Sequence, residues 1–199
     1  MTEPLGVILA GGQARRMGGG DKGRLMLKGQ SLFGRVIRRL GPQVDALALN
    51  ANGDPDRFRD LGLPVLPDSI AEYPGPLAGV LAGLDWAAEE GASHIVTAAA
   101  DTPFFPEDLV VRLQRAADRS GTPIALAGTQ EDGKSTRHPT FGFWPVNLRR
   151  DLRQALNGGL RKVVLWTDTH GAATAPFDDH AFFNINTPED LIVAEERLA

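Results

Sequence analysis

The chain has 199 residues, which is enough for one substantial hydrophobic core and leaves little room for two. Its formal net charge of -4 gives no overall positive field that would favour nucleic acid or an anionic membrane surface. It contains no cysteine, and no segment approaches the roughly 18 consecutive apolar residues of a membrane span, so we expect a cytoplasmic protein without disulfides or thiolate metal sites.

Apolar runs alternate with helical patterns through the first two thirds of the chain. Leu5–Ala10 is an apolar run that ends in two glycines, which predicts a buried parallel strand. Apolar residues recur at helical spacing from Leu32 to Leu40, with Ser31 as the expected N-cap and Gly41 as the stop. Further strands are expected at 44–49, 64–66, 94–100 and 124–127, and further helices at 55–61, 77–86 and 106–113, the last with a proline in its first turn.

This alternation predicts an α/β fold of right-handed βαβ units, with three αβα layers and a mostly parallel sheet. The alternation breaks after about residue 129, where Pro139–Pro145 is expected to be extended and Leu160–Thr167 helical. Thr187–Asp190 has the pattern of a capped helix start. No repeat or linker divides the sequence, so we expect residues 1–199 to form a single domain.

Polar residues follow the predicted strands at the points where the strands end. Asn50, Asp68 and Asp101 each come after a separate strand, and Gly11-Gly12 follows the first one. Ligands of open parallel sheets bind beyond the carboxyl ends of the strands. The sequence therefore predicts a binding site at this edge.

The loop after the first strand carries the strongest signal for phosphate. Its glycines let the backbone approach a ligand closely, and Arg15, Arg16 and Lys22 supply cationic donors. Glycines alone would indicate only a flexible surface loop. A G-x-G-x-x-G match at 18–23 begins too far from the strand to act as a dinucleotide motif, and Lys22 follows an aspartate and not the glycine of a Walker A loop.

At this point the chain resembles a known family. Leu9–Gly12, Arg16–Gly18 and Asp21-Lys22 together resemble the signature loop of the molybdenum cofactor guanylyltransferases, a branch of the nucleotidyltransferase superfamily. The resemblance spans nearly the whole chain, although Ala99-Ala100 stand where relatives often carry Pro-Cys. Further segments in the family's order are Asn50-Ala51-Asn52, Asp68, Tyr73–Gly79, Asp101-Thr102-Pro103, His138-Pro139-Thr140 and Asn184–Glu189.

The resemblance implies a Rossmann-like nucleotidyltransferase fold and a magnesium-dependent enzyme that transfers GMP from GTP to the phosphate of molybdopterin. The nucleotide-binding part is expected at about 1–128 and the pterin-binding part at about 129–199. It assigns catalysis to Lys22, Arg16 and Asp101, and the Mg²⁺ ion to Asp101. A carboxylate at a strand end suits magnesium, which prefers hard oxygen ligands. The implied GTP site consists of Leu9, Ala10, Gly11, Gly12, Lys22, Asn50, Asp68 and Asp101.

Several of these residues admit a second interpretation. Asn50 and Asp68 could bind either guanine or the ribose hydroxyls, and Asn52 fits a turn. His138 could contact the pterin or pack beside the following proline. Asn184 and Asn186 are expected on the pterin side, although an asparagine before a helix is often a cap.

Three rival functions remain at this stage. The cytidylyltransferase of the same cofactor tends to carry Ala-Ala-Gly where this chain has Ala10-Gly11-Gly12. Sugar-phosphate nucleotidyltransferases usually continue with Gly-Thr-Arg-Leu, whereas this chain has Ala14–Met17. A non-catalytic partner that delivers cofactor would need neither Lys22 nor Asp101. Proteins of molybdenum cofactor biosynthesis and delivery are the expected protein partners.

Overall fold

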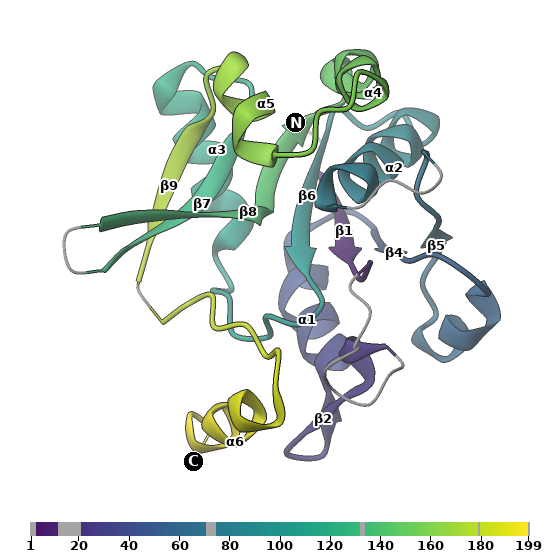
Figure 1. The fold of residues 1–199 in the computed structure, drawn as a ribbon, viewed down its shortest axis with the longest axis vertical. Coiled ribbons are helices and arrows are strands. Elements are labelled where there is room, and N and C mark those ends of the chain that lie inside the picture. Colours follow the sequence, from purple (N-terminus) through teal and green to yellow (C-terminus); the bar gives the residue numbers. More distant parts are fainter. Residues whose placement is uncertain (1–2, 12–20, 71–74, 132–133, 179, 199) are drawn as a thin grey trace.

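The computed structural model describes residues 3–11, 21–70, 75–131, 134–178 and 180–198. Its central strands are β1 (Leu5–Leu9), β4 (Leu47–Asn50), β5 (Val65–Leu66), β6 (His94–Ala99), β7 (Ala125–Glu131), β8 (Lys134–Pro145) and β9 (Ala173–Phe177). They form a seven-stranded sheet in the order β5-β4-β1-β6-β8-β7-β9 (Figure 1). β8 pairs antiparallel with β6 and β7, while the remaining neighbours in this sheet pair parallel. The predicted mostly parallel architecture is confirmed.

Helices cover both faces of this sheet, so the chain has the three expected layers. The helices are α1 (Leu32–Leu40), α2 (Pro76–Glu89), α3 (Leu109–Ser120), α4 (Arg149–Asn157), α5 (Val163–Thr169) and α6 (Pro188–Glu196). Apolar side chains of α1 and α3 form one core with the sheet, and those of α2, α4 and α5 form a second core. α6 packs away from the sheet, against the hairpin of β2 (Met26–Leu27) and β3 (Gln30–Ser31) (Figure 1). No helix in the described ranges is long and apolar enough to cross a membrane.

Two local features fix the helices next to β1. Ser31 caps α1 as predicted, because its Oγ accepts a hydrogen bond from the Gly34 N–H at 3.1 Å. α2 lies directly on the sheet, and a Cβ at Gly83 would come within 2.7 Å of Val7 Cγ2 and 2.9 Å of Ile95 Cδ1. This close approach needs glycine, and it brings the N-terminus of α2 to the carboxyl ends of β1 and β4.

A bulge interrupts the pairing of β8 with β7. Leu126 pairs with Gly142, but the next residue, Ala127, pairs with His138, so residues 139–141 fall between the two pairs. Proline at 139 has no N–H to give to the ladder, which suits it to a bulge. The irregularity releases Thr140 from the regular ladder at the carboxyl end of β6.

Several predicted boundaries are wrong; for example, the strand expected at 124–127 runs from Ala125 to Glu131. The strand expected at 44–49 begins at Leu47, because the helical turn continues from α1 through a 3₁₀ turn at Gly41–Gln43. Gly41 has right-handed helical geometry, so it ends the α-helix without a left-handed cap. Pro106 precedes α3 and lies outside its first turn, since its carbonyl accepts from the Leu109 N–H at 3.2 Å where the helix begins. The helix expected from Leu160 begins at Val163.

The elements that were missed include β2, β3, α4 and β9, and the last two have weak patterns. In α4 the fully buried side chains are Leu152 and Leu156, and the surrounding residues are mostly polar. β9 alternates buried and exposed residues, but it is built from alanines with a proline at 176. Proline is tolerated at β9 because this strand forms the edge of the sheet. α4 and β9 gain their stability from tertiary packing more than from the helix or strand propensity of their residues.

Buried polar pairing inside the sheet leads to a stability prediction. Thr97 is fully buried on β6, and its Oγ1 accepts from Trp144 Nε1 at 2.9 Å. Thr97→Val keeps the shape but leaves the buried indole N–H without this acceptor, so we expect the free energy of unfolding to fall by about 1–3 kcal/mol. Thr122→Val is the matched control, because the partly exposed Thr122 hydroxyl donates to the Ile124 carbonyl and water can replace it there. Urea unfolding measures both, and equal losses would contradict the assigned role of the buried hydroxyl.

Candidate functional site

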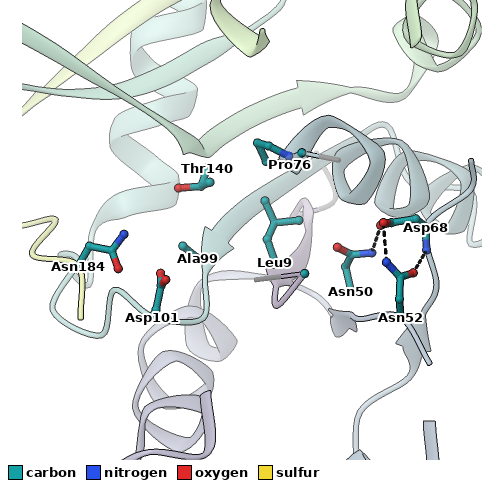
Figure 2. Close-up of a pocket in the computed structure, with 11 residues that line it drawn as sticks. Leu9, Asn50, Asn52, Asp68, Pro76, Ala99, Asp101, Thr140 and Asn184 are labelled. Atoms are coloured by element: carbon teal, nitrogen blue, oxygen red, sulfur yellow. Dashed lines mark hydrogen bonds between the residues drawn. The ribbon is translucent and has the colours of Figure 1, made fainter. Parts of the chain in front are cut away.

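A cavity of about 360 Å³ opens at the carboxyl ends of β1, β4, β5 and β6. This volume lies within the usual range for small-molecule sites. Figure 2 shows two polar ends: Asp68 lies with two asparagines at one end, and Asp101 lies near Asn184 at the other. Leu9 and Pro76 lie between them. The cavity is lined by Leu9, Gly11, Asn50, Asn52, Asp68, Gly75, Pro76, Ala99, Asp101, Thr140 and Asn184.

Asp68 is held in place by the two asparagines that follow β4. Its Oδ1 accepts from Asn50 Nδ2 at 2.9 Å, and its Oδ2 accepts from Asn52 Nδ2 at 2.7 Å. The Asp68 N–H donates in turn to Asn52 Oδ1 at 2.9 Å. A carboxylate has about four acceptor positions, so both oxygens keep capacity for a ligand. This end of the cavity presents an oriented acceptor.

Asn50 is itself held between β5 and α2. It is 3% exposed, and its Nδ2 also donates to the Leu66 carbonyl at 3.1 Å. Both N–H groups of its amide are therefore used inside the protein, which leaves Oδ1 as an acceptor. A Cβ at Gly79 of α2 would lie 2.2 Å from that oxygen, so glycine is required where the helix passes over Asn50.

Lys22 and Asp101 form the centre of the opposite end. Lys22 Nζ lies 3.3 Å from Asp101 Oδ2 and 2.6 Å from Asn186 Oδ1. The two charged side chains are 17% and 21% exposed, so this ion pair is only partly hydrated. The Asp101 carbonyl accepts from the Ile185 N–H at 2.9 Å. A smaller cavity here shares Leu9 and Asp101 with the main one and is also lined by Ala10 and Lys22.

His138 does not line the main cavity. Its ring stacks on Phe182 with 4.5 Å between centroids, and its Nε2 lies 2.9 Å from Thr129 Oγ1. Burial lowers the pKa of His138 below its ordinary value of 6.5. Of its two predicted roles, these contacts favour packing.

Most of the predicted site residues gather around the two cavities. Gly12 and Arg16, together with the neighbouring Arg15, lie outside the described residues. Asn186 contacts Lys22 and is not among the residues that line the main cavity. Predicted residues that do line one of the cavities are Leu9, Ala10, Gly11, Lys22, Asn50, Asp68, Asp101 and Asn184.

Five of the residues that line the main cavity were not predicted as site residues. Asn52 was interpreted as a turn residue, yet it makes two hydrogen bonds with Asp68. The repeated asparagine after a strand was the available signal for it. Thr140 reaches the cavity through the β8 bulge, which leaves little trace in the local sequence. Gly75, Pro76 and Ala99 complete this group, and they contribute shape more than polar contacts.

The donor set limits what kind of metal site is possible. Within the described part of the chain, no three His, Cys, Asp or Glu side chains are grouped closely enough to hold an ion. Asp101 is the carboxylate at its end of the main cavity, and Asp21 lines the smaller cavity together with it. Magnesium is usually bound by one or two carboxylates together with substrate phosphates and water. Asp101 fits a cation whose coordination a phosphate ligand completes.

Comparison with known proteins assigns the family. Residues 6–171 match the model of the MobA-like NTP transferase domain. The chain is 53% identical over 197 residues to the molybdenum cofactor guanylyltransferase of Cereibacter sphaeroides, covering 98% of this chain and 96% of the relative. It is 50% identical over 204 residues to the enzyme of that name from Bradyrhizobium sp., covering 100% and 94%. The chain belongs to the MobA-like NTP transferase family.

The resemblance drawn from the first loop is thereby confirmed, and this MobA-like transferase is a nucleotidyltransferase. Among solved structures, it is similar to the molybdopterin-guanine dinucleotide biosynthesis protein A of Archaeoglobus fulgidus, with a TM-score of 0.72 and 24% identity. The match covers 98% of each chain. At this identity the likeness supports the fold.

The partly buried position of His138 predicts a pH dependence of stability. Its folded-state pKa lies below the unfolded value of about 6.5, so the unfolded chain binds the proton more readily. The stability that neutral His138 contributes is present above about pH 6.5 and is lost as the pH falls through the lower, folded-state pKa. We expect His138→Gln to reduce the loss of thermal stability between pH 7.5 and 5, and NMR titration of wild-type His138 to give a pKa below 6.5. An unchanged pH profile in the variant would contradict this expectation.

Proposed function

We propose that this MobA-like transferase joins GMP, taken from GTP, to the phosphate of molybdopterin, forming molybdopterin guanine dinucleotide and pyrophosphate. The observation that carries the proposal is a cavity with Asp68, a carboxylate acceptor held by two asparagines, at one end and with Asp101, the ion-pair partner of Lys22, at the other. A nucleoside triphosphate needs both kinds of contact, one for its base and one for its phosphates. Relatives with about half of their residues identical carry the name of this activity.

The Asp68 end suits guanine. Guanine presents N1–H and N2–H₂ as neighbouring donors, and the Asp68 carboxylate is an acceptor that two asparagines hold in place. Adenine lacks both of these donors, so it would leave the acceptor without a partner. Asn50 supports the same choice, because its own amide N–H groups are already used.

The opposite end suits the phosphates. Lys22 donates to phosphate oxygens, and Arg16 of the first loop is proposed to do the same. Asp101 would hold Mg²⁺ together with the nucleotide phosphates, and the ion would supply positive charge that offsets theirs. In this proposal Lys22 contacts the phosphates directly, and Asp101 acts on them through the Mg²⁺ ion.

The chemistry needs alignment more than proton transfer. An oxygen of the molybdopterin phosphate attacks the α-phosphorus of GTP, the bond from this phosphorus to the bridging oxygen breaks, and pyrophosphate leaves with the electron pair. The attacking phosphate is already ionised at neutral pH, so no general base is required. Lys22 and the loop cation stabilise the charge that develops on the α-phosphate and the leaving group.

The pterin side is proposed to lie towards the later part of the chain. Thr140 and Asn184 line the cavity from β8 and from the segment before α6. Asn184 lies near Asp101, which is where the acceptor phosphate must arrive (Figure 2). This supports the division into a nucleotide-binding part at about 1–128 and a pterin-binding part at about 129–199. Cofactor-delivery proteins would present molybdopterin at this side.

The base preference tests the function directly. We expect kcat/KM for GTP to exceed that for ATP by roughly 30-fold or more, because two unpaired buried groups cost on the order of 1–3 kcal/mol each. CTP should also react poorly, since its smaller base leaves part of the cavity empty. The protein is incubated with molybdopterin, Mg²⁺ and each of the four nucleotides, and the dinucleotide is identified by mass. Preference for CTP would indicate a cytidylyltransferase, and no dinucleotide with any nucleotide would favour a delivery protein.

Removal of the Asp101 charge tests the phosphate end. Asp101→Asn should fold normally and lose about 10²–10³-fold in kcat, as expected when one preorganised electrostatic contact is removed. Asp168→Asn is the control, because Asp168 is exposed on α5 and pairs with Arg137 away from the cavity. Steady-state kinetics over a range of Mg²⁺ concentrations measures both variants. Turnover near that of the wild type at limiting Mg²⁺ would remove Asp101 from the metal site.

A further inference from the structure

The shortest hydrogen bond of Lys22 links two distant parts of the chain. Lys22 Nζ lies 2.6 Å from Asn186 Oδ1, closer than the 3.3 Å that separates it from Asp101 Oδ2. Asn186 is 164 residues further along the chain, in the segment that leads into α6. The sequence predicted this residue on the pterin side, but its side chain contacts the lysine proposed for the nucleotide phosphates.

The segment that carries Asn186 is fixed from both sides. On one side, Asp190 Oδ2 accepts from the backbone N–H groups of Asn186 at 2.8 Å and Thr187 at 2.9 Å. This is half of a capping box, whose other half is the bond from the Asp190 N–H to Thr187 Oγ1. On the other side, the fully buried Ile185 donates its N–H to the Asp101 carbonyl at 2.9 Å. The backbone that carries the Asn186 side chain is therefore held in position before any ligand binds.

A neutral acceptor has a particular effect on a lysine. The ammonium has three donors, so bonds to Asn186 and Asp101 leave one for a phosphate oxygen. An amide oxygen orients the ammonium without cancelling its charge, as a second carboxylate would. Lysine has a flexible four-carbon stem, and fixing it beforehand reduces the conformational entropy lost when the phosphate binds.

We propose that Asn186 is a positioning residue for Lys22, and that the segment before α6 therefore contributes to binding of the triphosphate. The inference rests on the proposed function, because it assumes that Lys22 binds the phosphates of GTP. It differs from a role on the pterin side in one measurable respect. A pterin contact leaves GTP affinity unchanged when molybdopterin is absent, whereas a contact that positions Lys22 changes it.

A double-mutant cycle on GTP binding tests the proposal. Binding of GTP with Mg²⁺, without molybdopterin, is measured by calorimetry for wild type, Lys22→Ala, Asn186→Ala and the double variant. We expect each single variant to weaken binding roughly tenfold, the scale of a lost hydrogen bond to a charged group. The double variant should bind no more weakly than Lys22→Ala, because Asn186 acts only through the lysine. Unchanged affinity in Asn186→Ala, or additive losses, would overturn the proposal.

A second pair of variants covers the case in which Asn186→Ala fails to fold. Asp190→Ala releases the backbone of Asn186, whereas Thr187→Ala removes another bond of the same cap and leaves Asp190 bonded to the Asn186 N–H. Each loses about 0.5–2 kcal/mol of cap stability, so thermal unfolding should shift similarly in both. GTP affinity should fall in Asp190→Ala and hold in Thr187→Ala. Equal affinities in the two variants would overturn the proposal.

The same measurements separate this proposal from the proposed function. If wild type binds CTP more tightly than GTP, or binds neither, the assignment as a guanylyltransferase fails, and the inference fails with it. If wild type binds GTP and Asn186→Ala binds it equally well, only the role of Asn186 is wrong. The proposed transfer of GMP to molybdopterin would then still stand, because it does not depend on Asn186.

Discussion

The carboxyl end of β1 is hydrogen-bonded on both sides, and the site depends on these two bonds. The Ala10 N–H donates to the Asn50 carbonyl at 2.9 Å, and the Leu9 carbonyl accepts from the Ala100 N–H at 3.0 Å. The first bond lies where β4 ends, and the second lies just after the end of β6, two residues before Asp101. The Asn50–Asp68 end and the Asp101 end of the cavity are therefore held at a fixed separation by the backbone, before any side chain contributes.

The segment before α6, in the later part of the chain, also contacts this site. The Ile185 N–H donates to the Asp101 carbonyl, and Asn186 Oδ1 accepts from Lys22 Nζ. The segment before α6 therefore contacts both members of the Lys22–Asp101 ion pair. The net charge of the chain is -4, so positive charge for a phosphate ligand must come from side chains at the site itself, such as Lys22. In the proposed binding mode the phosphates of the nucleotide would lie near the negative Asp101 as well as the positive Lys22. A cation that accompanies the nucleotide would suit the site, because it would offset the repulsion between the Asp101 carboxylate and the phosphates.

Much of the fold and of the nucleotide end could be predicted from short segments. The apolar run before Gly11, the caps Ser31 and Thr187, and the polar residues that end each strand are local patterns with direct physical meaning. Strand ends in a parallel sheet must meet at one edge, so Asn50, Asp68 and Asp101 could be placed together without coordinates. α4 and β9 were missed because their buried positions are few or small, and only their neighbours make them stable.

The sequence by itself determined the family, the α/β class and the carboxylates at the strand ends. Only the tertiary structure decided which side chains act on one another: that Asn186 bonds to Lys22, that Thr140 leaves the ladder at a bulge, and that His138 stacks on an aromatic ring. Caps and strand patterns extend over a few residues and can be recognised in the chain itself. A contact between residues 22 and 186 depends on how α6 packs against the β2–β3 hairpin, and that packing is a property of the whole folded chain.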